Sequence, residues 1–414
     1  MCEMVAQAVT KSVSRRRLLG SSAVLAAGAL TGAVLGGGPA AAAATTSGGA
    51  NPGNDTARRY STRLVLLGTA GGPPWWPGTD REGIGSAVVV NDAVYIIDFG
   101  DGSGRRFKQA ALVPHNLQTP GGLWGEENIR AMFLTHLHSD HLSDYFNYLM
   151  LGWYNGITAA HPPIQVYGPG RRVDDQDTVV MEPIFTPPGL PTPTVPVINP
   201  DNPVPGIEDT TNYLYQAFAL DLNDRMRDNL KPDLRGIFDV NDIAIPKGIG
   251  YHPNTNPSPP GMAPLPVFQD ANVRVTATLV NHFPIVPAFG FRFDSADGSI
   301  VFSGDTAPND NLIALAQGAD ILVHEVIDPA WVEILFPPPT TPVEDSLKNH
   351  LLTAHTTIDD VGKVAQRARV KKLVLSHIVP GNASVQSLRK AGRNFSGQLI
   401  IGEDLMQIGV GRRR

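Results

Sequence analysis

The chain has 414 residues, of which 42% are hydrophobic and 17% are charged. These values fit a globular protein and exclude a disordered or fibrous one. The formal net charge of −6 argues against a partner that is a polyanion, because nucleic-acid binding draws much of its affinity from lysine and arginine on phosphates. The 42 glycines and 36 prolines favour many turns and long loops around a β-rich scaffold.

The first 44 residues have the pattern of an export signal. An arginine pair lies within Ser14–Leu19, a moderately apolar Gly/Ala-rich run follows, and small residues from Pro39 to Ala44 offer a cleavage site. This order is typical of a twin-arginine signal peptide over residues 1–44, with a polar linker over 45–60. The many glycines disfavour the alternative, an uncleaved membrane anchor. We expect the twin-arginine export machinery as a partner, a periplasmic or extracellular location, and no stable membrane anchor.

Removal of the signal would make the exported protein more acidic. It takes away four basic residues and one acidic residue, so the net charge falls from −6 to −9. The single cysteine, Cys2, lies in the signal, so the exported chain has no disulfide and no thiolate to bind a metal. Nucleic acid is therefore not expected as a partner.

Residues 61–411 are predicted to form one domain of strands and helices. A strand from residue 62 leads into a Gly/Pro loop, and a hairpin turns at Asn91-Asp92. Apolar spacing then predicts a helix, a strand, a second helix and a short strand, over 105–115, 128–135, 141–154 and 163–169.

Residues 171–270 differ from the rest in their proline runs, which flank one predicted helix over 210–230. Such a long irregular stretch inside a domain is more often a lid or a substrate wall than a linker, so we interpret it as an insertion. Regular structure then returns, with strands over 271–283, 288–306, 320–327, 371–380 and 397–410 and helices over 311–319 and 357–370. Helices alternate with strands, which favours two layers of sheet with helices outside.

The segment "THLHSDH" places four ligand-type residues directly behind an apolar strand. They are His136, His138, Asp140 and His141. Imidazole and carboxylate are ordinary zinc ligands, and His136 and His138 alternate off an extended segment, so that both can bind one ion. Asp140 and His141 lie where the loop turns into the helix, and are directed at a neighbouring position. The alternative is a chance surface cluster, which the position at the end of a buried strand disfavours.

Three more candidate ligands follow apolar strands further along the chain. His282 follows "VRVTATLVN", Asp305 follows "SIVFSG" and His377 follows "KKLVLS". Each one alone could be a hydrogen-bonded structural residue. Together with the cluster, they predict a site for two metal ions at a shared sheet edge.

These motifs, with "VNHFPIVPAFGFRF", "VHE" and "AHTT", resemble the metallo-β-lactamase superfamily, in the branch that holds ribonuclease Z, zinc arylsulfatases and phosphodiesterases. The resemblance runs from about residue 63 to 410 and implies an α/β (α+β) fold, a four-layer αββα sandwich with a proline-rich insertion. It implies two Zn²⁺ ions, for which Mn²⁺ or Fe²⁺ are alternatives because nitrogen and oxygen ligands accept several metals. One ion would be bound by His136, His138 and His282, the other by Asp140, His141 and His377, with Asp305 bridging them.

The resemblance also implies roles beside the ions. A hydroxide made from water between the metals would be the nucleophile, oriented or deprotonated by Asp140. His355 matches the family's H-[ST]-T position and is proposed to stabilise the developing charge or to protonate the leaving group; the alternative is a local hydrogen bond to Thr356 or Asp359. Glu325 would orient one of the histidines; the alternative is a buried pair with His324. Asp98 would order the metal loop.

The substrate is less defined. Ribonuclease Z typically has a basic, glycine-rich arm, whereas here only "DSADG" joins two strands near residue 296 and the insertion is not basic. We therefore expect a small phosphodiester or sulfate ester, with possible aromatic walls at Trp75, Trp76, Tyr213, Tyr215 and Phe218. Alternatives are a lactonase or β-lactamase-type acyl hydrolase, a ribonuclease Z-like endoribonuclease, and a non-catalytic metal-binding module. A homodimer remains open.

Overall fold

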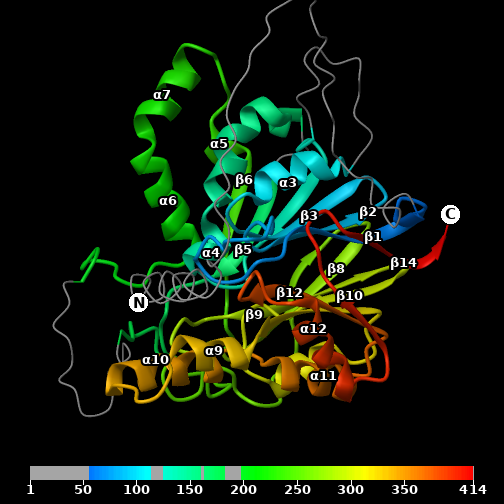
Figure 1. Cartoon of the computed structure of the whole chain (residues 1–414). Coiled ribbons are helices and arrows are strands. Elements are labelled where there is room, and N and C mark those ends of the chain that lie inside the picture. Colours follow the sequence, from blue (N-terminus) through cyan, green and yellow to red (C-terminus); the bar gives the residue numbers. More distant parts are fainter. Residues whose placement is uncertain (1–55, 113–124, 160–162, 182–196, 414) are drawn as a thin grey trace, which may run out of the picture.

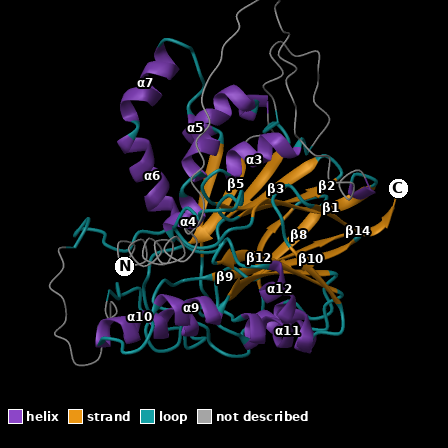
Figure 2. Ribbon diagram, in the orientation of Figure 1, coloured by secondary structure: helices purple, strands orange, loops and turns teal. Residues whose placement is uncertain are grey.

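The computed structural model describes residues 56–112, 125–159, 163–181 and 197–413. The expected export signal and the linker up to residue 55 lie outside these residues. Two seven-stranded sheets pack face to face, and helices cover the outer face of each (Figures 1 and 2). The expected α/β sandwich is confirmed. In the described ranges no helix combines the length and apolar character needed to cross a membrane.

The first sheet has the strand order β14-β1-β2-β3-β4-β5-β6. From β14 to β3 neighbouring strands are antiparallel, and from β3 to β6 they are parallel. Its strands are β1 (Tyr60–Gly68), β2 (Gly85–Val90), β3 (Ala93–Phe99), β4 (Ile129–Phe133), β5 (Ile164–Pro169), β6 (Phe238–Ile243) and β14 (Gln407–Arg413).

The second sheet repeats this plan in the order β13-β12-β11-β10-β9-β8-β7. From β7 to β10 the strands are antiparallel, and from β10 to β13 they are parallel. Its strands are β7 (Leu265–Gln269), β8 (Val273–Leu279), β9 (Phe289–Ser295), β10 (Gly298–Phe302), β11 (Ile321–Ile327), β12 (Lys372–Val379) and β13 (Gln398–Ile401).

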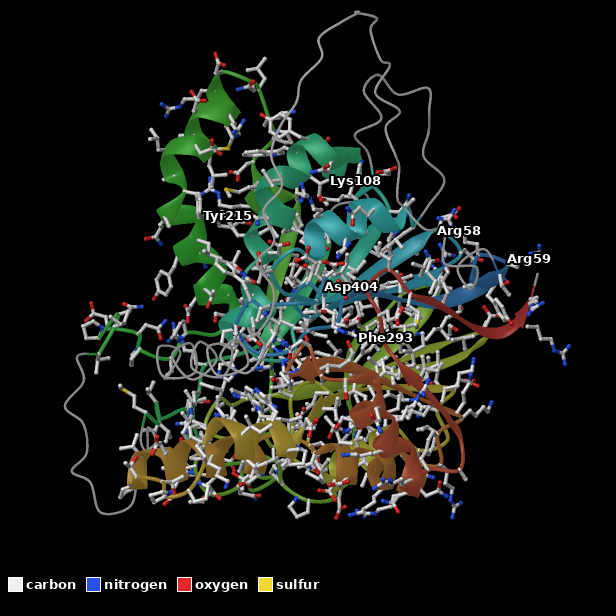
Figure 3. All side chains as sticks on the ribbon, in the orientation of Figure 1. Arg58, Arg59, Lys108, Tyr215, Phe293 and Asp404 are labelled. Carbon is white, nitrogen blue, oxygen red and sulfur yellow. The ribbon has the colours of Figure 1, made fainter. Side chains whose placement is uncertain are left out.

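Alternation along the strands creates the layers. In β1, Leu64 and Leu66 pack between the sheets, whereas Val65 and Leu67 pack under the helices of the first half, as a period of two requires. Phe293, labelled in Figure 3, is one of several phenylalanines between the sheets. The first sheet is covered by α3 (Ser103–Ala110), α4 (Ser139–Leu142) and α5 (Tyr145–Asn155), and the second half carries α8 (Asp310–Leu315), α9 (Pro329–Leu335), α10 (Pro342–Thr353), α11 (Ile358–Arg367) and α12 (Val385–Leu388).

The segment interpreted as an insertion over 171–270 contains more sheet than we expected. It holds two helices, α6 (Ile207–Ala217) and α7 (Ala219–Arg227), where one was predicted, and β6 and β7 within it are edge strands of the two sheets. Edge strands tolerate proline and charge, and Asp239, Asp242 and Pro266 in them hide the alternation. β6 and β7 therefore belong to the sandwich, and α6 and α7 project from it (Figure 1).

Candidate metal centre

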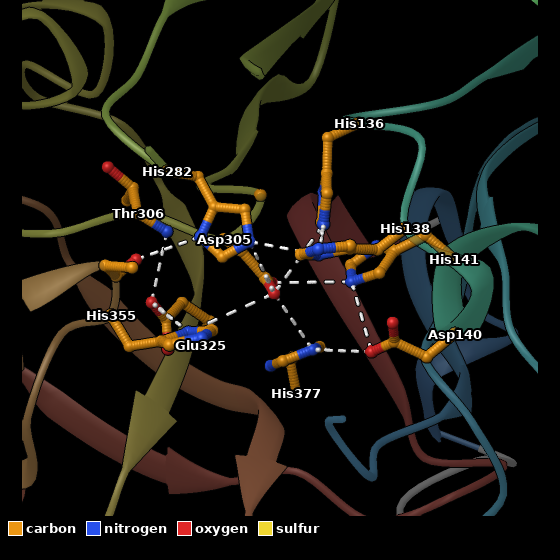
Figure 4. Close-up of polar contacts among 12 residues, drawn as sticks. His136, His138, Asp140, His141, His282, Asp305, Thr306, Glu325, His355 and His377 are labelled. Atoms are coloured by element: carbon orange, nitrogen blue, oxygen red, sulfur yellow. Dashed lines mark hydrogen bonds and ion pairs between the residues drawn. The ribbon is translucent and has the colours of Figure 1, made fainter. Parts of the chain in front are cut away.

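The predicted ligands meet at one edge of the sandwich, at the carboxyl ends of the strands. The first half supplies His136, His138, Asp140 and His141 from the loop and short helix after β4. The second half supplies His282 after β8, Asp305 after β10 and His377 near the end of β12. These strands run in the same direction within each sheet, so their ends lie at one edge, and Figure 4 shows the Asp305 carboxylate at the centre of the group.

The first group of ligand atoms contains three histidines and an aspartate. His138 Nδ1 lies 3.0 Å from His136 Nε2 and 3.1 Å from His282 Nε2. Asp305 Oδ2 lies 3.9 Å from both of those Nε2 atoms. All four ligand atoms lie within 4.8 Å of one another, so a single cation among them could contact each one.

The second group contains Asp140, His141 and His377. Asp140 Oδ2 lies 3.7 Å from His141 Nε2 and 3.4 Å from His377 Nε2. Asp305 borders this group as well, with Oδ1 3.5 Å from His141 Nε2 and Oδ2 3.2 Å from His377 Nε2. The Asp305 carboxylate therefore lies between the two groups.

Hydrogen-bond partners of the ligand histidines orient the rings of His282 and His141, so that Nε2 of each ring faces the centre. His282 Nδ1 lies 3.0 Å from the carbonyl oxygen of Ala354, and His141 Nδ1 lies 3.0 Å from Asp98 Oδ2. Asp98 Oδ1 also accepts a hydrogen bond from the backbone N–H of Thr135 at 2.8 Å. Such contacts hold Nδ1 protonated and leave Nε2 as the metal-binding atom. The position of Asp98 fits the ordering role that the resemblance implied.

Two non-glycine residues at this edge adopt left-handed backbone conformations. Asp98 has φ 57° and His377 has φ 43°. Such angles are uncommon for residues with a Cβ and concentrate at functional sites, where surrounding structure enforces them. The fold therefore maintains local strain at a histidine that faces the centre and at an aspartate that supports it.

His355 and Glu325 adjoin the centre on the side of His282. His355 Nδ1 lies 3.3 Å from Glu325 Oε1 and 4.0 Å from Asp305 Oδ2. Glu325 Oε1 also accepts hydrogen bonds from the backbone N–H groups of Thr306, at 3.1 Å, and Thr356, at 2.9 Å. Glu325 thus connects the loops that carry Asp305 and His355, while His324 Nδ1 lies 2.8 Å from the carbonyl oxygen of Glu325.

Charge and burial set the protonation of the ligands. Burial lowers the pKa of His136 and His282 well below the usual histidine value, so both are neutral. Burial alone would raise the pKa of Asp140 and Asp305, but neighbouring histidines outweigh it and lower both values. Burial alone would lower the pKa of His141, and Asp305, Asp98 and Asp140 reverse this and raise it. The carboxylates are thus ionised and His136 and His282 are neutral, the states in which these groups bind metal, whereas His141 has to release its proton when a metal binds.

The residues fit a metal. Within the described residues, the buried His141 Nε2 and Asp305 Oδ1 have no hydrogen-bond partner although both face the centre. Buried polar atoms in proteins are nearly always satisfied, and divalent cations are the natural partners for atoms of this kind. The five histidines and two aspartates of the two groups supply only nitrogen and oxygen ligands, which suit zinc and several other first-row metals.

The aromatic residues proposed as substrate walls lie in different places. Tyr215 and Phe218 pack against Phe146 of α5, at centroid distances of 5.6 and 5.1 Å, so they hold the α6–α7 projection to the first half. Trp76 is buried against Trp331. Trp76, Tyr215 and Phe218 are therefore packing residues, whereas Trp75 is exposed.

Comparison with known sequences agrees with the fold. Residues 246–378 match the beta-lactamase superfamily domain. Ribonuclease Z of Mycobacterium bovis (strain BCG / Pasteur 1173P2) is 28% identical over 354 residues, which cover 85% of this chain and 99% of the relative. Ribonuclease Z of Mycobacterium marinum is 27% identical over 353 residues, 84% of this chain and 99% of the relative.

Among solved structures, human tRNase Z, short form, aligns with 18% identity and a TM-score of 0.49 over 84% of this chain and 99% of that one. A metallo-beta-lactamase fold protein from Bacillus subtilis has 15% identity and the same TM-score, over 84% and 99% of the two chains.

The sequence matches, together with the sandwich and its edge of histidines and aspartates, support a metal-dependent hydrolase with the metallo-β-lactamase fold. The relatives named above, which align over nearly their whole length, are ribonucleases Z. The expectation of a hydrolase with this fold is confirmed. The name of the relatives goes against the expectation that nucleic acid is not a partner, which rested on net charge and on the lack of a basic arm.

Some contacts of the centre carried no signal in the sequence. The carbonyl of Ala354 orients His282, and the hydroxyl of Thr135 lies 3.2 Å from His136 Nδ1. A backbone carbonyl can follow any residue type, so composition and spacing do not reveal it. The threonine before the first histidine is visible in "THLHSDH", but its hydroxyl is recognised as a support only when Asp98 is placed beside it.

Proposed function

We propose that this protein hydrolyses phosphodiesters at a centre that binds two divalent cations, with zinc as the expected metal. The observation that carries the proposal is the Asp305 carboxylate, whose oxygens lie 3.2–3.9 Å from nitrogens of His136, His141, His282 and His377. His136, His138 and His282 would bind one cation, Asp140, His141 and His377 the other, and Asp305 both. When bound, such a pair polarises the phosphoryl oxygens and lowers the pKa of a water nucleophile.

The chain's own groups complete the chemistry. Asp140, kept ionised by His141 and His377, is proposed to orient the attacking water and to accept its proton. His355 is proposed to donate a proton to the leaving-group oxygen; burial alone would lower its pKa, but Glu325 and Asp305 reverse this and raise it to about 9. Glu325 is a positioning residue, because it contacts His355 and two backbone N–H groups and none of the ligand atoms of the two groups.

The test is a substrate panel run beside metal analysis. We expect two metal equivalents per chain and metal-dependent release of nitrophenol from bis-p-nitrophenyl phosphate. The panel also contains p-nitrophenyl sulfate, a γ-lactone and a β-lactam, which represent the sulfatase and acyl-hydrolase alternatives. A fully metallated protein that cleaves the lactone or the β-lactam but no diester would contradict the proposal.

A second candidate is processing of RNA, which the ribonuclease Z relatives favour because they align over 99% of their length. Two features count against it: β9 and β10 are joined only by Ala296 and Asp297, and α7 carries Asp221 and Asp224 beside its two arginines. A precursor transfer RNA with a 3′ extension separates the candidates. Cleavage at the extension that weakens steeply with salt would support RNA, whereas cleavage of small diesters alone would support the first proposal.

We also propose that residues 1–44 direct export by the twin-arginine route. The support is the arginine cluster followed by the Gly/Ala-rich run and the small-residue tract. The joint replacement of Arg15, Arg16 and Arg17 by lysine should keep the protein in the cytoplasm, as measured by cell fractionation. Sequencing of the exported protein should begin near residue 45; an intact N-terminus outside the cell would contradict cleavage.

A further inference from the structure

The loop after β1 carries two adjacent tryptophans with opposite environments. Trp76 is 8% exposed, packs edge-on against Trp331 at 5.5 Å and donates from Nε1 to the carbonyl of Gly71 at 2.9 Å. Trp75 is 87% exposed. Its Nε1 nevertheless donates a 2.7 Å hydrogen bond to Asp101 Oδ2. Trp75 is therefore an exposed indole held in one orientation.

The two loops that hold Trp75 contact the metal centre. On the Trp75 side, the N–H of Gly72 lies 3.3 Å from His377 Nε2, and a Cβ at Gly71 would lie 2.3 Å from the His377 ring. On the Asp101 side, a Cβ at the preceding Gly100 would lie 2.6 Å from the carbonyl oxygen of Asp140. The loops that hold Trp75 and its partner Asp101 thus contact His377 and the backbone of Asp140, two members of the second ligand group.

Neighbouring segments hold the loop of Trp75 in place. A Cβ at Gly381 would lie 2.4 Å from the Trp76 ring, so the two segments are in close contact, and Asn382 Nδ2 donates to the carbonyl of Pro77 at 3.0 Å. Arg106 donates to the carbonyl of Asp80 at 2.6 Å. A side chain presented by a rigid loop loses little conformational entropy when it binds a ligand.

We propose that Trp75 is a stacking platform for a ring, a nucleobase or an aryl group, attached to the phosphodiester. The inference rests on the proposed function and makes Trp75 a specificity-determining residue outside the catalytic group. An indole face binds any flat ring, because each has a π surface. The Asp101 carboxylate takes the only polar atom of the indole, so the faces of the ring remain available to substrate.

Binding of two phosphonates to the metal-loaded full chain, measured by calorimetry, tests the platform without turnover. Phenylphosphonate and methylphosphonate share a head group and differ in the ring. Stacking of one ring has an effect of about tenfold in affinity. Trp75→Ala should remove about tenfold of the preference for phenylphosphonate and leave methylphosphonate binding unchanged. Trp75→Phe keeps a ring face and should keep most of that preference.

Two further variants control for general effects. Leu220→Ala removes an apolar side chain that is 88% exposed on α7 and should change neither affinity. Asp101→Ala removes the partner of the indole N–H and should give an intermediate loss for phenylphosphonate only.

The outcomes separate the platform from the proposed function. If the wild type hydrolyses diesters and Trp75→Ala keeps the full phenyl preference, the platform is overturned and the proposed function stands. Equal loss of both phosphonates in Trp75→Ala would also overturn the platform, because the effect would then lie at the metal centre. A metal-loaded wild type that binds neither phosphonate and cleaves no diester overturns both.

Discussion

The two halves of the sandwich supply the same centre in different ways. In the first half, one loop after β4 presents four ligands within six residues, whereas in the second half each of three strand ends presents one. Each ligand group draws on both halves: His136 and His138 meet His282 and Asp305, and Asp140 and His141 meet His377. One short loop thus places four ligands by its local conformation. The three ligands of the second half come together only when the strands of the second sheet pair in their correct order.

The largest expected effect comes from the one residue that serves both groups. Asp305→Ala should lower kcat/KM for bis-p-nitrophenyl phosphate by about 10³-fold, the order seen when a preorganised charged group is lost from an active site. Metal analysis should show fewer than two equivalents per chain. Asp310→Ala, a change at an exposed aspartate on α8, is the control. Full activity in Asp305→Ala would mean that the halves do not share a ligand.

Each half has one carboxylate that supports the ligands without belonging to either ligand group. Asp98 holds His141 and the N–H of Thr135 in the first half, and Glu325 holds the N–H groups of Thr306 and Thr356 in the second. Loss of such outer partners usually weakens metal affinity 10–100-fold. Asp98→Ala should weaken chiefly one of the two binding steps in a metal titration, and Glu325→Ala both, because Glu325 supports the loop of the shared Asp305. If Asp98→Ala and Glu325→Ala gave the same metal titration, the two carboxylates would not support different ligand groups.

Metal removal should lower the thermal stability of the protein, because each ligand group contains residues from both halves. A ligand that binds only the folded state at about 100 times its Kd adds about 2.7 kcal/mol, which corresponds to roughly 4 °C in Tm for a domain of this size. We expect a chelator to lower the Tm of the wild type by that amount in differential scanning calorimetry. His138→Ala, which removes a ligand of the first group, should respond less to the chelator. A Tm unchanged by chelation would show that metal does not stabilise the fold.

The smallest effect concerns a carboxylate that lacks histidine neighbours. Burial, with Glu208 and Asp209, raises the pKa of Asp242 to about 6, the opposite of Asp140 and Asp305. A raised folded-state pKa gives stability that is present below pH 4 and lost as pH rises from about 4 to 6. Because Asp242 is only partly buried, screening reduces the effect to about 1 kcal/mol.

Urea unfolding at pH 4, 5 and 6 measures this difference. The wild type should lose about 1 kcal/mol more unfolding free energy across that range than Asp242→Asn. Asp239→Asn, at an exposed aspartate of the same strand, should keep the slope of the wild type. Parallel curves for the wild type and Asp242→Asn would contradict the raised pKa.

Much of the centre could be predicted from the sequence because of where polar residues stand. The "THLHSDH" loop is local, and His282, Asp305 and His377 each end a hydrophobic run, so parallel strands bring them to one edge. The geometry brings all seven together, as the hypothesis required. Their roles as ligands remain a prediction, since metal binding itself awaits measurement.

The rest could not be predicted for physical reasons. The edge strands β6 and β7 lie within 171–270, and neither was predicted, because the acids of β6 and the proline of β7 disguise the strand pattern. The helix over 210–230 breaks at Phe218, whose φ of −100° and ψ of 17° leave the helical region, although the apolar spacing continues across the break. The carbonyl of Ala354 beside His282 depends on tertiary contact alone.

The last strand of the chain belongs to the first sheet. After β13 completes the second sheet, β14 crosses over and pairs with β1, as Val65 with Gln407 and Leu64 with Ile408. The C-terminal strand thereby completes the sheet that the N-terminal strands begin. A chain that ends near residue 404 would lack β14, and β1 would lose its partner on that side. The uncovered strand would present unpaired N–H and C=O groups to other molecules. Shortened forms of this protein would thus tend to self-associate through β1.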